Sequence, residues 1–399
     1  MTPTPQTVVV RSGSQGEVLG FVCIDSTIND RARGGLRLMP DVSQDELEKL
    51  ARAMTLKYGF LGLPQGGAKG GVLGDPETSA EVRASVLLRF ARAAAPLLAR
   101  RTYVPDADMG TSGGDVQRML DGIGVRISPR EYRGSRSGDY TAGTVFEAAR
   151  AAVGIRGMAL EGCRVAIEGF GKVGSPLAEM FVRTGARVVA ISTKAGGLYN
   201  PRGLDIAALR ERGRAAGSSV VTEAHLGDRI NATELKRVPA DVFCPCARHD
   251  SVREDDVPTM PATVISCGAN SPIIPAAEHL LWERGVICVP DFVANSGGVL
   301  GGTMEFAGWR PGEIFDFYDR RFRARVEWLI RDAQRSGQPL RVAAETLAFA
   351  RFEDVKRQAE RGSWARRGMQ AALAVYREGW LPGRLVRRMS DEYFQRRLS

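Results

Sequence analysis

A lysine inside a glycine-rich segment is the first feature of the sequence that can do chemistry. Residues 65–71 read Gln-Gly-Gly-Ala-Lys-Gly-Gly, and Lys69 is the ionisable side chain among them. Close packing of glycine backbone around an amine removes it from water, and burial lowers the pKa of a lysine toward neutrality. Such an amine can accept and return a proton at neutral pH. Lys69 is therefore a candidate acid–base residue.

A second glycine-rich segment, Gly-Phe-Gly-Lys-Val-Gly, follows about a hundred residues later. It comes after a strand-like run at 163–168 and before a helical pattern. In that context its spacing is typical of a turn that seats a pyrophosphate on a helix N-terminus, although a glycine turn can also simply pack a helix on a strand. The candidate cofactor contacts are Gly169, Phe170, Gly171, Lys172, Val173 and Gly174. Together the two segments indicate a redox enzyme that binds a dinucleotide and uses an acid–base lysine.

The strand after this fingerprint bears on the choice of dinucleotide. It covers 186–192 and runs into Thr193 and Lys194, at the place where such strands normally end in a carboxylate that binds the ribose hydroxyls. A hydroxyl and a cation receive a 2′-phosphate better than a free hydroxyl. The sequence therefore favours NADP(H) over NAD(H).

Strand and helix patterns alternate around these segments. A hairpin is predicted at 7–24, a helix at 43–58 capped by Ser43, another helix at 79–98, and a short strand at 103–105 that leads to Asp106 and Asp108. Further on, the patterns predict a helix at 141–153 and strands at 163–168, 186–192, 242–244, 262–267 and 285–290. This alternation predicts an α/β fold with a parallel, doubly wound sheet and its ligand at the carboxyl ends of the strands. Roughly the last 80 residues read as helical.

Length and composition limit the class of protein. A chain of 399 residues, 44% hydrophobic and 25% charged, is ordinary for a soluble protein of about two domains. It has no apolar run of about 20 residues and no secretory signal at its start, so we expect a cytoplasmic protein with reduced cysteines and no membrane partner.

The net charge of +9 gathers partly near the C-terminus. Residues 351–399 hold 12 Lys and Arg against 6 Asp and Glu, an excess of six positive charges. Arginines there interleave with apolar residues such as Tyr376 and Leu385, as on amphipathic helices. We interpret this stretch as a solvated helix face and predict no nucleic-acid partner. Nucleic-acid binding, the alternative, would show a steep salt dependence of affinity.

Seven ordered segments between residues 33 and 299 resemble the glutamate/leucine/phenylalanine/valine dehydrogenase family. They are Gly34–Arg37, Met54–Lys57, Pro64–Gly71, Asp108–Thr111, Gly169–Gly174, Gly268–Pro272 and Pro290–Gly298. The resemblance implies an N-terminal α/β substrate and oligomerisation domain at 1–138, to which C-terminal helices at 345–399 return, and a Rossmann domain at 139–344. It also implies a cleft that closes on substrate and a homo-oligomer, a hexamer or an octamer.

The resemblance further implies reversible oxidative deamination of an L-α-amino acid to a 2-oxo acid and ammonium. Lys57 would bind the substrate α-carboxylate, Lys69 would activate the water that attacks the iminium, and Asp108 would shuttle a proton at the substrate nitrogen. The residues that would contact the nicotinamide or its ribose are Thr141, Asn270 and Asn295. For the two lysines and the aspartate, the alternative is a role in surface salt bridges.

Three positions bear on the substrate. Arg33 stands where glutamate-specific members tend to carry lysine, Gly302 where they place a hydroxyl, and Asp106 where a small neutral residue is usual. Glutamate is the first expectation, and a non-acidic amino acid, apolar or basic, is the alternative because Asp106 would repel a γ-carboxylate. A catalytically silent relative that only binds cofactor is a further alternative, raised by the altered segment Arg248–Asp250 and by Thr193.

A metal site is not predicted. Cys244 and Cys246, with His249 nearby, invite a zinc interpretation. Their spacing suits a tetrahedral site poorly, and no second pair of ligands lies close in the sequence.

Overall fold

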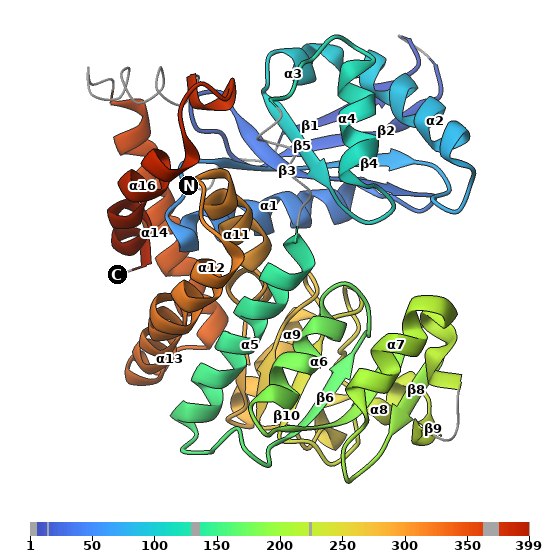
Figure 1. Ribbon diagram of the computed structural model, residues 1–399, viewed down its shortest axis with the longest axis vertical. Helices are drawn as coiled ribbons and strands as arrows, with labels where there is room; N and C mark the ends of the chain where they lie inside the picture. The colour runs from blue at the N-terminus through green and yellow to red at the C-terminus, as the bar shows by residue number, and fades with distance from the viewer. Residues whose placement is uncertain (1–5, 14–15, 129–135, 223–225, 362–374, 399) are drawn as a thin grey trace. The chain divides into compact units, whose positions relative to one another are not determined.

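The computed structural model describes residues 6–13, 16–128, 136–222, 226–361 and 375–398. It divides into two compact units, which are drawn in Figure 1. The first unit takes in Met1–Ser135, Phe306–Gly308 and Leu347–Tyr393. The second takes in Arg136–Glu305, Trp309–Thr346 and Phe394–Ser399.

The first unit is built on a five-stranded sheet. Its strands are β1 (Gln6–Arg11), β2 (Val18–Ile24), β3 (Ala32–Met39), β4 (Gly66–Leu73) and β5 (Tyr103–Ala107), in the order β1-β2-β4-β3-β5. β1 and β2 form the predicted hairpin, with Val8 opposite Val22. β2 runs antiparallel to β4, whereas β3 runs parallel to both β4 and β5. The carboxyl ends of β3, β4 and β5 therefore point the same way.

Helices cover both faces of this sheet. They are α1 (Gln44–Leu61), α2 (Ala80–Ala93), α3 (Ala95–Ala99) and α4 (Gly113–Asp121). Leu47 and Ala51 of α1 pack with Cys23 on one face, while α2 and α4 pack on the other. Ser43 caps α1 as predicted, by accepting a hydrogen bond from the backbone N–H of Glu46 at 3.3 Å.

One expectation about the first unit is wrong. The single helix expected at 79–98 is two helices, because the first helix ends before Ala94 and α3 begins at Ala95, with Pro96 in its first turn. The segment around Lys69, for which no element was predicted, is the central strand β4. Gly67 allows α1 to lie close to β4, because a Cβ at Gly67 would lie 2.3 Å from the backbone nitrogen of Thr55 on α1.

The second unit holds a seven-stranded sheet. Its strands are β6 (Arg164–Glu168), β7 (Arg187–Thr193), β8 (Gly196–Tyr199), β9 (Asp228–Ile230), β10 (Val242–Pro245), β11 (Val264–Ser266) and β12 (Ile287–Val289). The order is β12-β11-β10-β6-β7-β8-β9, and the first five of these run parallel, as predicted. β8 and β9 add antiparallel strands at one edge and were not predicted. The chain moves from β6 to one side and then to the other, so β6 and β10 border the switch point where such sheets bind ligands.

The remaining elements of the second unit are helical up to α14, which runs on into the first unit. They are α5 (Ser137–Ile155), α6 (Gly174–Arg183), α7 (Ile206–Ala216), η1 (Gly217–Thr222), α8 (Ala232–Leu235), η3 (Val257–Thr259), α9 (Pro275–Glu283), α10 (Asp291–Ala294), α11 (Gly297–Phe306), α12 (Pro311–Phe317), η4 (Tyr318–Phe322), α13 (Arg323–Ser336) and α14 (Leu340–Glu360). The last helix, α16, spans Gly383–Leu398. The described part of the C-terminal stretch is thus helical, as predicted. Among the described residues, no helix is both long and apolar enough to cross a membrane.

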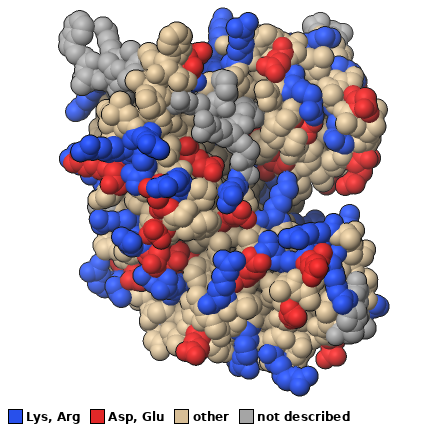
Figure 2. All heavy atoms as spheres, viewed as in Figure 1, with Lys and Arg blue, Asp and Glu red and all other residues tan. Residues whose placement is uncertain are grey.

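Charge is mixed over the face shown in Figure 2. Lys and Arg side chains lie there beside Asp and Glu side chains instead of forming one continuous patch. The pattern on this face is that of a solvated surface and offers no broad basic stripe for a nucleic-acid backbone.

Candidate active site

The α1-facing side of the first sheet carries a cluster of charged side chains. Side chains alternate along a strand, and Leu36 and Leu38 of β3 pack with α2 and α4. The intervening residues of β3, Arg33, Gly35 and Arg37, therefore face α1. Lys69 of β4 shares that face with Gly67, which α1 contacts.

Lys69 and Asp108, which were predicted to act together, form an ion pair. The Nζ of Lys69 lies 2.7 Å from Oδ2 of Asp108, and the Lys69 side chain is 5% exposed. Gly35 leaves the room for this contact, because a Cβ there would lie 3.1 Å from the Lys69 Nζ and 2.8 Å from the Asp108 Cβ. A larger residue at position 35 would separate the pair.

Asp108 also contacts a second cation, Arg37, which was not predicted as a site residue. The Nε of Arg37 donates to Oδ2 of Asp108 at 3.2 Å, and its NH1 donates to Glu46 of α1. Burial raises the pKa of Asp108, but the charges of Lys69 and Arg37 outweigh burial and lower that pKa to about 2. Asp108 is therefore a carboxylate at neutral pH.

Arg33 and Asp106 form a separate pair on the same face. Two parallel hydrogen bonds join them, from Nε to Oδ2 at 2.6 Å and from NH2 to Oδ1 at 2.7 Å. Their side chains are 36% and 43% exposed, so the pair is reachable from solvent. The charges of Arg33 and Asp106 compensate each other, and this pairing was not predicted from the sequence. Lys57, the expected α-carboxylate ligand, is a buried residue of α1.

The glycine fingerprint forms a turn between β6 and α6. Gly169 has φ +94°, and a Cβ there would lie 2.9 Å from Ala247, while a Cβ at Gly174 would lie 1.8 Å from the Gly169 oxygen. These two glycines serve the turn itself. A Cβ at Gly171 would instead meet no atom within 4 Å. Within the described residues, no side chain caps the N-terminus of α6.

This turn fits a pyrophosphate. An uncapped helix N-terminus leaves amide N–H groups that favour an anion, and the open space at Gly171 lets the anion approach the backbone. Lys172 and Phe170 complete the turn. The Phe170 N–H donates to the Ser192 carbonyl at 2.8 Å, and the Lys172 backbone packs on Gly138 at the start of α5. Val173 precedes α6, and its carbonyl accepts from Leu177.

Two predicted amides meet at the ends of β11 and β12. Nδ2 of Asn295 donates to Oδ1 of Asn270 at 3.0 Å and to the Ala269 carbonyl at 3.0 Å. Oδ1 of Asn295 is buried and has no hydrogen-bond partner among the described residues. A buried acceptor of this kind calls for a donor, such as the amide N–H of a nicotinamide carboxamide. Thr141 on α5 lies close by, with its Oγ1 2.8 Å from the Cβ position of Gly298.

The end of β7 is tied to the glycine turn by Ser192, which was not predicted. The Gly169 N–H donates to the Ser192 hydroxyl at 3.2 Å. The Thr193 hydroxyl donates to the Ser218 carbonyl at 2.6 Å, so this hydroxyl already serves the fold. Lys194 is exposed just beyond the strand. Of the two residues predicted to receive a 2′-phosphate, Lys194 is thus the one with an exposed polar group.

Gly302, one of the predicted substrate residues, does not lie close to the other predicted substrate residues in the sequence or in the same unit. Gly302 is an exposed residue of α11 in the second unit, and a Cβ there would meet no atom within 4 Å. Arg33 and Asp106 belong to the first unit.

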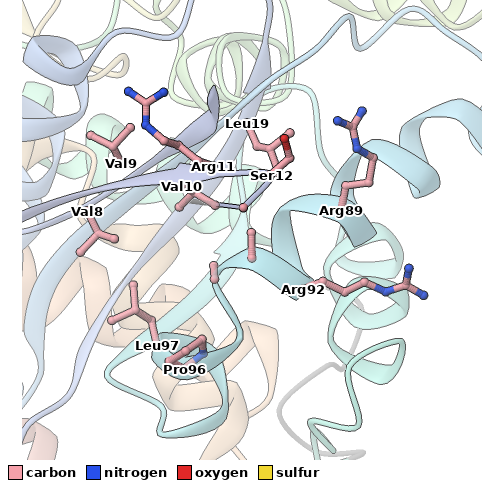
Figure 3. A pocket seen from close by; sticks show the side chains of 13 residues that line it. Val8, Val9, Val10, Arg11, Ser12, Leu19, Arg89, Arg92, Pro96 and Leu97 are labelled. Atoms are coloured by element: carbon pink, nitrogen blue, oxygen red, sulfur yellow. The ribbon is translucent and has the colours of Figure 1, made fainter. Parts of the chain in front are cut away.

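The groove shown in Figure 3 lies apart from the predicted residues. It has a volume of about 820 Å³ and runs beside β1 and helices α2 and α3, lined by Val8, Val9 and Leu97 together with Arg11 and Arg92. None of the predicted site residues lines it. We place the candidate active site by its ion pairs and not by this groove. No metal-binding group of three or more His, Cys, Asp or Glu occurs in the part of the chain that the structure describes.

Comparison with known proteins decides the family. A model described as glutamate/leucine/phenylalanine/valine dehydrogenase matches residues 135–360, and one described as the dimerisation domain of the same dehydrogenases matches residues 6–124. The chain belongs to this family. The predicted fold class and the predicted class of enzyme, an NAD(P)-dependent amino-acid dehydrogenase, are confirmed.

Individual relatives agree with this assignment. This dehydrogenase is 31% identical over 343 residues to the NAD-specific glutamate dehydrogenase of Staphylococcus aureus (strain COL), with 82% of each chain covered. It is 32% identical over 378 residues to the NADP(+)-dependent glutamate dehydrogenase of Pyrobaculum calidifontis, covering 88% of this chain and 84% of that one. A crystal structure of hetero-hexameric glutamate dehydrogenase from Thermus thermophilus, in a leucine-bound form, superposes with a TM-score of 0.76 at 29% identity over 90% of each chain.

Proposed function

We propose that this dehydrogenase converts L-glutamate reversibly to its 2-oxo acid and ammonium, with Lys69 and Asp108 as the acid–base pair. The observation that carries the proposal is the ion pair between these side chains at 2.7 Å, with Arg37 3.2 Å from the same carboxylate oxygen, Oδ2 of Asp108. Glutamate is proposed because the two curated relatives above are glutamate dehydrogenases.

The proposed chemistry begins with positioning. Lys57 holds the α-carboxylate of the substrate as a point charge. Asp108, held ionised by its two cations, accepts the proton that the substrate nitrogen loses as the α-carbon gives up a hydride and becomes an iminium carbon. The bound coenzyme supplies the hydride acceptor. Lys69, once it has released its own proton, takes a proton from the water that attacks the iminium carbon. Asp108 returns its proton to the carbinolamine nitrogen, and ammonia leaves as the hydroxyl proton is lost and the carbonyl forms.

The proposed coenzyme contacts are the residues of the second unit described above. The glycine turn 169–174 would hold the pyrophosphate, and Thr141, Asn270 and Asn295 would hold the nicotinamide and its ribose. Thr193 and Lys194 would lie at the adenosine ribose. NADP(H) is proposed as the preferred coenzyme because β7 ends in Ser192 and Thr193, where a carboxylate is usual, and runs into exposed Lys194.

We predict that Gly171→Ala weakens coenzyme binding without affecting the fold. An added Cβ meets open space in the protein alone, so the free energy of unfolding should stay near the wild-type value. The same methyl group would occupy the space of the pyrophosphate and should raise the Kd of the coenzyme about tenfold or more. Fluorescence titration and urea unfolding measure the two effects. Gly154→Ala is the matched control, since it adds a methyl group to open space on α5. Equal coenzyme affinity in both variants would show that Gly171 does not face the coenzyme.

A second substrate class is favoured by the Arg33–Asp106 pair. A guanidinium that already donates two hydrogen bonds to Asp106 is compensated in charge and offers little net attraction to a γ-carboxylate. The pair lies two residues from Gly35 and Asp108 along β3 and β5, which is about 7 Å and within reach of an amino-acid side chain. A non-acidic amino acid is therefore the alternative substrate.

We predict that Asp106→Ala shifts specificity toward glutamate. Removing the carboxylate takes away the negative charge that compensates Arg33 at this pair, so the ratio of kcat/KM for glutamate to that for leucine should rise about tenfold or more. Steady-state kinetics with both amino acids measures the ratio. Asp121→Ala removes an exposed aspartate of α4 and should leave the ratio unchanged. A ratio that also stays constant in Asp106→Ala would place the pair outside the substrate pocket.

The proposed assembly is a homo-oligomer, with a hexamer or an octamer as the expected size. The match of residues 6–124 to a dimerisation domain and the hexameric state named for the Thermus thermophilus relative support an oligomer. The proposed partners are small molecules alone, with no nucleic acid or membrane, and the proposed location is the cytoplasm.

The experiment that tests the proposed function is a substrate panel. Purified protein is mixed with a set of acidic, apolar and basic L-amino acids and with NAD⁺ or NADP⁺, and coenzyme reduction is followed by absorbance. Turnover of glutamate with a preference for NADP⁺ is the expected result. Turnover of apolar or basic amino acids alone would select the alternative substrate class. No turnover in protein that still binds coenzyme would indicate a catalytically silent member.

A further inference from the structure

A buried cluster of ion pairs lies next to the segments that carry Asn270 and Asn295. Arg341 of α14 donates from Nε to the carboxylate of Glu278 on α9 and from NH2 to Oδ1 of Asp291 on α10, the latter at 3.0 Å. The side chains of Glu278 and Asp291 are 11% and 2% exposed. The Arg341 guanidinium also lies over the ring of Phe292, 5.8 Å from its centre. One cation thus bridges two buried carboxylates from different elements.

The second oxygen of Asp291 holds the turn that carries Asn270. The backbone N–H of Ser271 donates to Oδ2 of Asp291 at 2.9 Å. Ser271 has φ +45°, a left-handed conformation that costs energy for a residue other than glycine, so the turn depends on contacts that hold it. The carboxylate of Asp291 is one of these contacts, and the carbonyl of Ser271 accepts a further bond from the Asp250 N–H at 2.9 Å.

Asp291 is connected to Asn295 as well. It starts the short helix α10, and the Asn295 N–H donates to the Asp291 carbonyl at 2.8 Å. Asn295 in turn donates its amide N–H to Oδ1 of Asn270. The orientation of the Asn295 amide is fixed by three facing oxygens, those of Gly268, Ala269 and Asn270. Its Oδ1 consequently points away from them as a buried acceptor without a partner among the described residues.

We propose that Arg341 is the positioning residue for the nicotinamide end of the coenzyme site. It fixes Asp291, Asp291 fixes the backbone at Ser271, and this backbone presents Asn270 and Asn295 to the coenzyme. Arg341 itself does not touch the coenzyme. The inference rests on the coenzyme contacts proposed above for the two asparagines and adds a residue that no sequence motif marked.

The test separates the two ends of the coenzyme. Arg341→Met is titrated with the oxidised coenzyme and with ADP-ribose, or its 2′-phosphate if NADP⁺ is the coenzyme, because this fragment lacks nicotinamide. We expect Kd for the whole coenzyme to rise about tenfold or more while Kd for the fragment stays within about twofold of wild type. In steady-state kinetics, KM for the coenzyme should rise more than kcat falls.

Arg164→Met is the matched control. Arg164 stands at the start of β6, at the opposite end of the strand from the glycine turn, and makes two side-chain hydrogen bonds to Asp241, at 3.1 and 2.7 Å. It should leave both dissociation constants unchanged. Arg341→Lys keeps the charge but lacks the planar fork that bridges two carboxylates, so it should fold and show a smaller loss of coenzyme affinity. It replaces Arg341→Met if that variant does not fold.

The outcomes distinguish this inference from the proposed function. Asn295→Ala tests the coenzyme contact directly and should weaken the coenzyme but not the fragment. If Asn295→Ala behaves in this way while Arg341→Met and Arg341→Lys bind coenzyme as wild type does, the positioning role is overturned and the contact stands. An equal loss for coenzyme and fragment in the Arg341 variants would also overturn it, because it would indicate general damage. Wild-type protein that binds neither NAD⁺ nor NADP⁺ would overturn both.

Discussion

Replacing Lys69 with alanine should lower kcat for amino-acid deamination by about 10²–10⁴-fold, the range for loss of a general acid–base group. Lys69 pairs with Asp108 at 2.7 Å, and its side chain is 5% exposed, so no bulk water can readily substitute for the amine. Coenzyme affinity should not change, because the fingerprint glycines lie in the other unit. Steady-state kinetics and a coenzyme titration measure the two effects.

Lys49→Ala is the control for this variant. Lys49 is an exposed residue of α1, and its removal changes the net charge by the same amount without touching the cluster. It should retain wild-type kcat. A Lys69→Ala variant that deaminates as fast as Lys49→Ala would remove Lys69 from the mechanism.

Replacing Asp108 with asparagine should lower kcat strongly and destabilise the first unit. The substitution leaves two cations, Lys69 and Arg37, side by side without the carboxylate that joins them. Removing one partner of a buried ion pair typically costs about 3–5 kcal/mol. Urea unfolding followed by fluorescence measures the loss, and kcat should fall as far as it does in Lys69→Ala. Asp121→Asn, on an exposed aspartate, should lose neither stability nor rate.

The destabilisation should depend on pH in a definite direction. The pKa of Asp108 is lowered to about 2 in the folded protein, whereas an unfolded aspartate has a pKa of about 3.9. The unfolded chain therefore binds the proton first as the pH falls, and the contribution of the ionised carboxylate, about 2 kcal/mol, is present above about pH 4 and lost toward pH 2. The difference in free energy of unfolding between wild type and Asp108→Asn should shrink by about that amount. A difference that stays constant from pH 5 to about pH 2 would contradict the lowered pKa.

Much of the fold could be predicted from local patterns. The hairpin, α1 and the parallel strands around the glycine turn have clear periodicity or a strong cap. Local patterns did not reveal two features of the first unit. The segment around Lys69 has the glycine content of a loop, yet the close approach of α1 to Gly67 makes it a central strand. The helix break at Ala94 depends on Pro96 in a run that is otherwise strongly helical. In both cases tertiary packing or a single residue outweighed local propensity.

The sequence predicted which residues belong to the candidate site, but not which side chains contact one another there. Lys69 and Asp108 stand out through their motifs, whereas the bond between Arg33 and Asp106 depends on the alignment of β3 with β5, 73 positions apart. The spacing of Arg37 could have marked it as a site residue, because it lies on the same face of one strand as Arg33 and Gly35. The role of Arg341 leaves no such trace, because Arg341 on α14 and its two partners on α9 and α10 are far apart in the sequence.

The most direct test of the central claim is the stoichiometry of the wild-type reaction. Reduced coenzyme, 2-oxo acid and ammonium should be measured in the same reaction with the best substrate of the panel. Equal amounts of all three are expected, because each hydride transferred leaves one iminium carbon that releases one ammonium ion. Reduced coenzyme without ammonium, or no reduction of bound coenzyme by any amino acid, would contradict the assignment of Lys69 and Asp108 to amino-acid deamination.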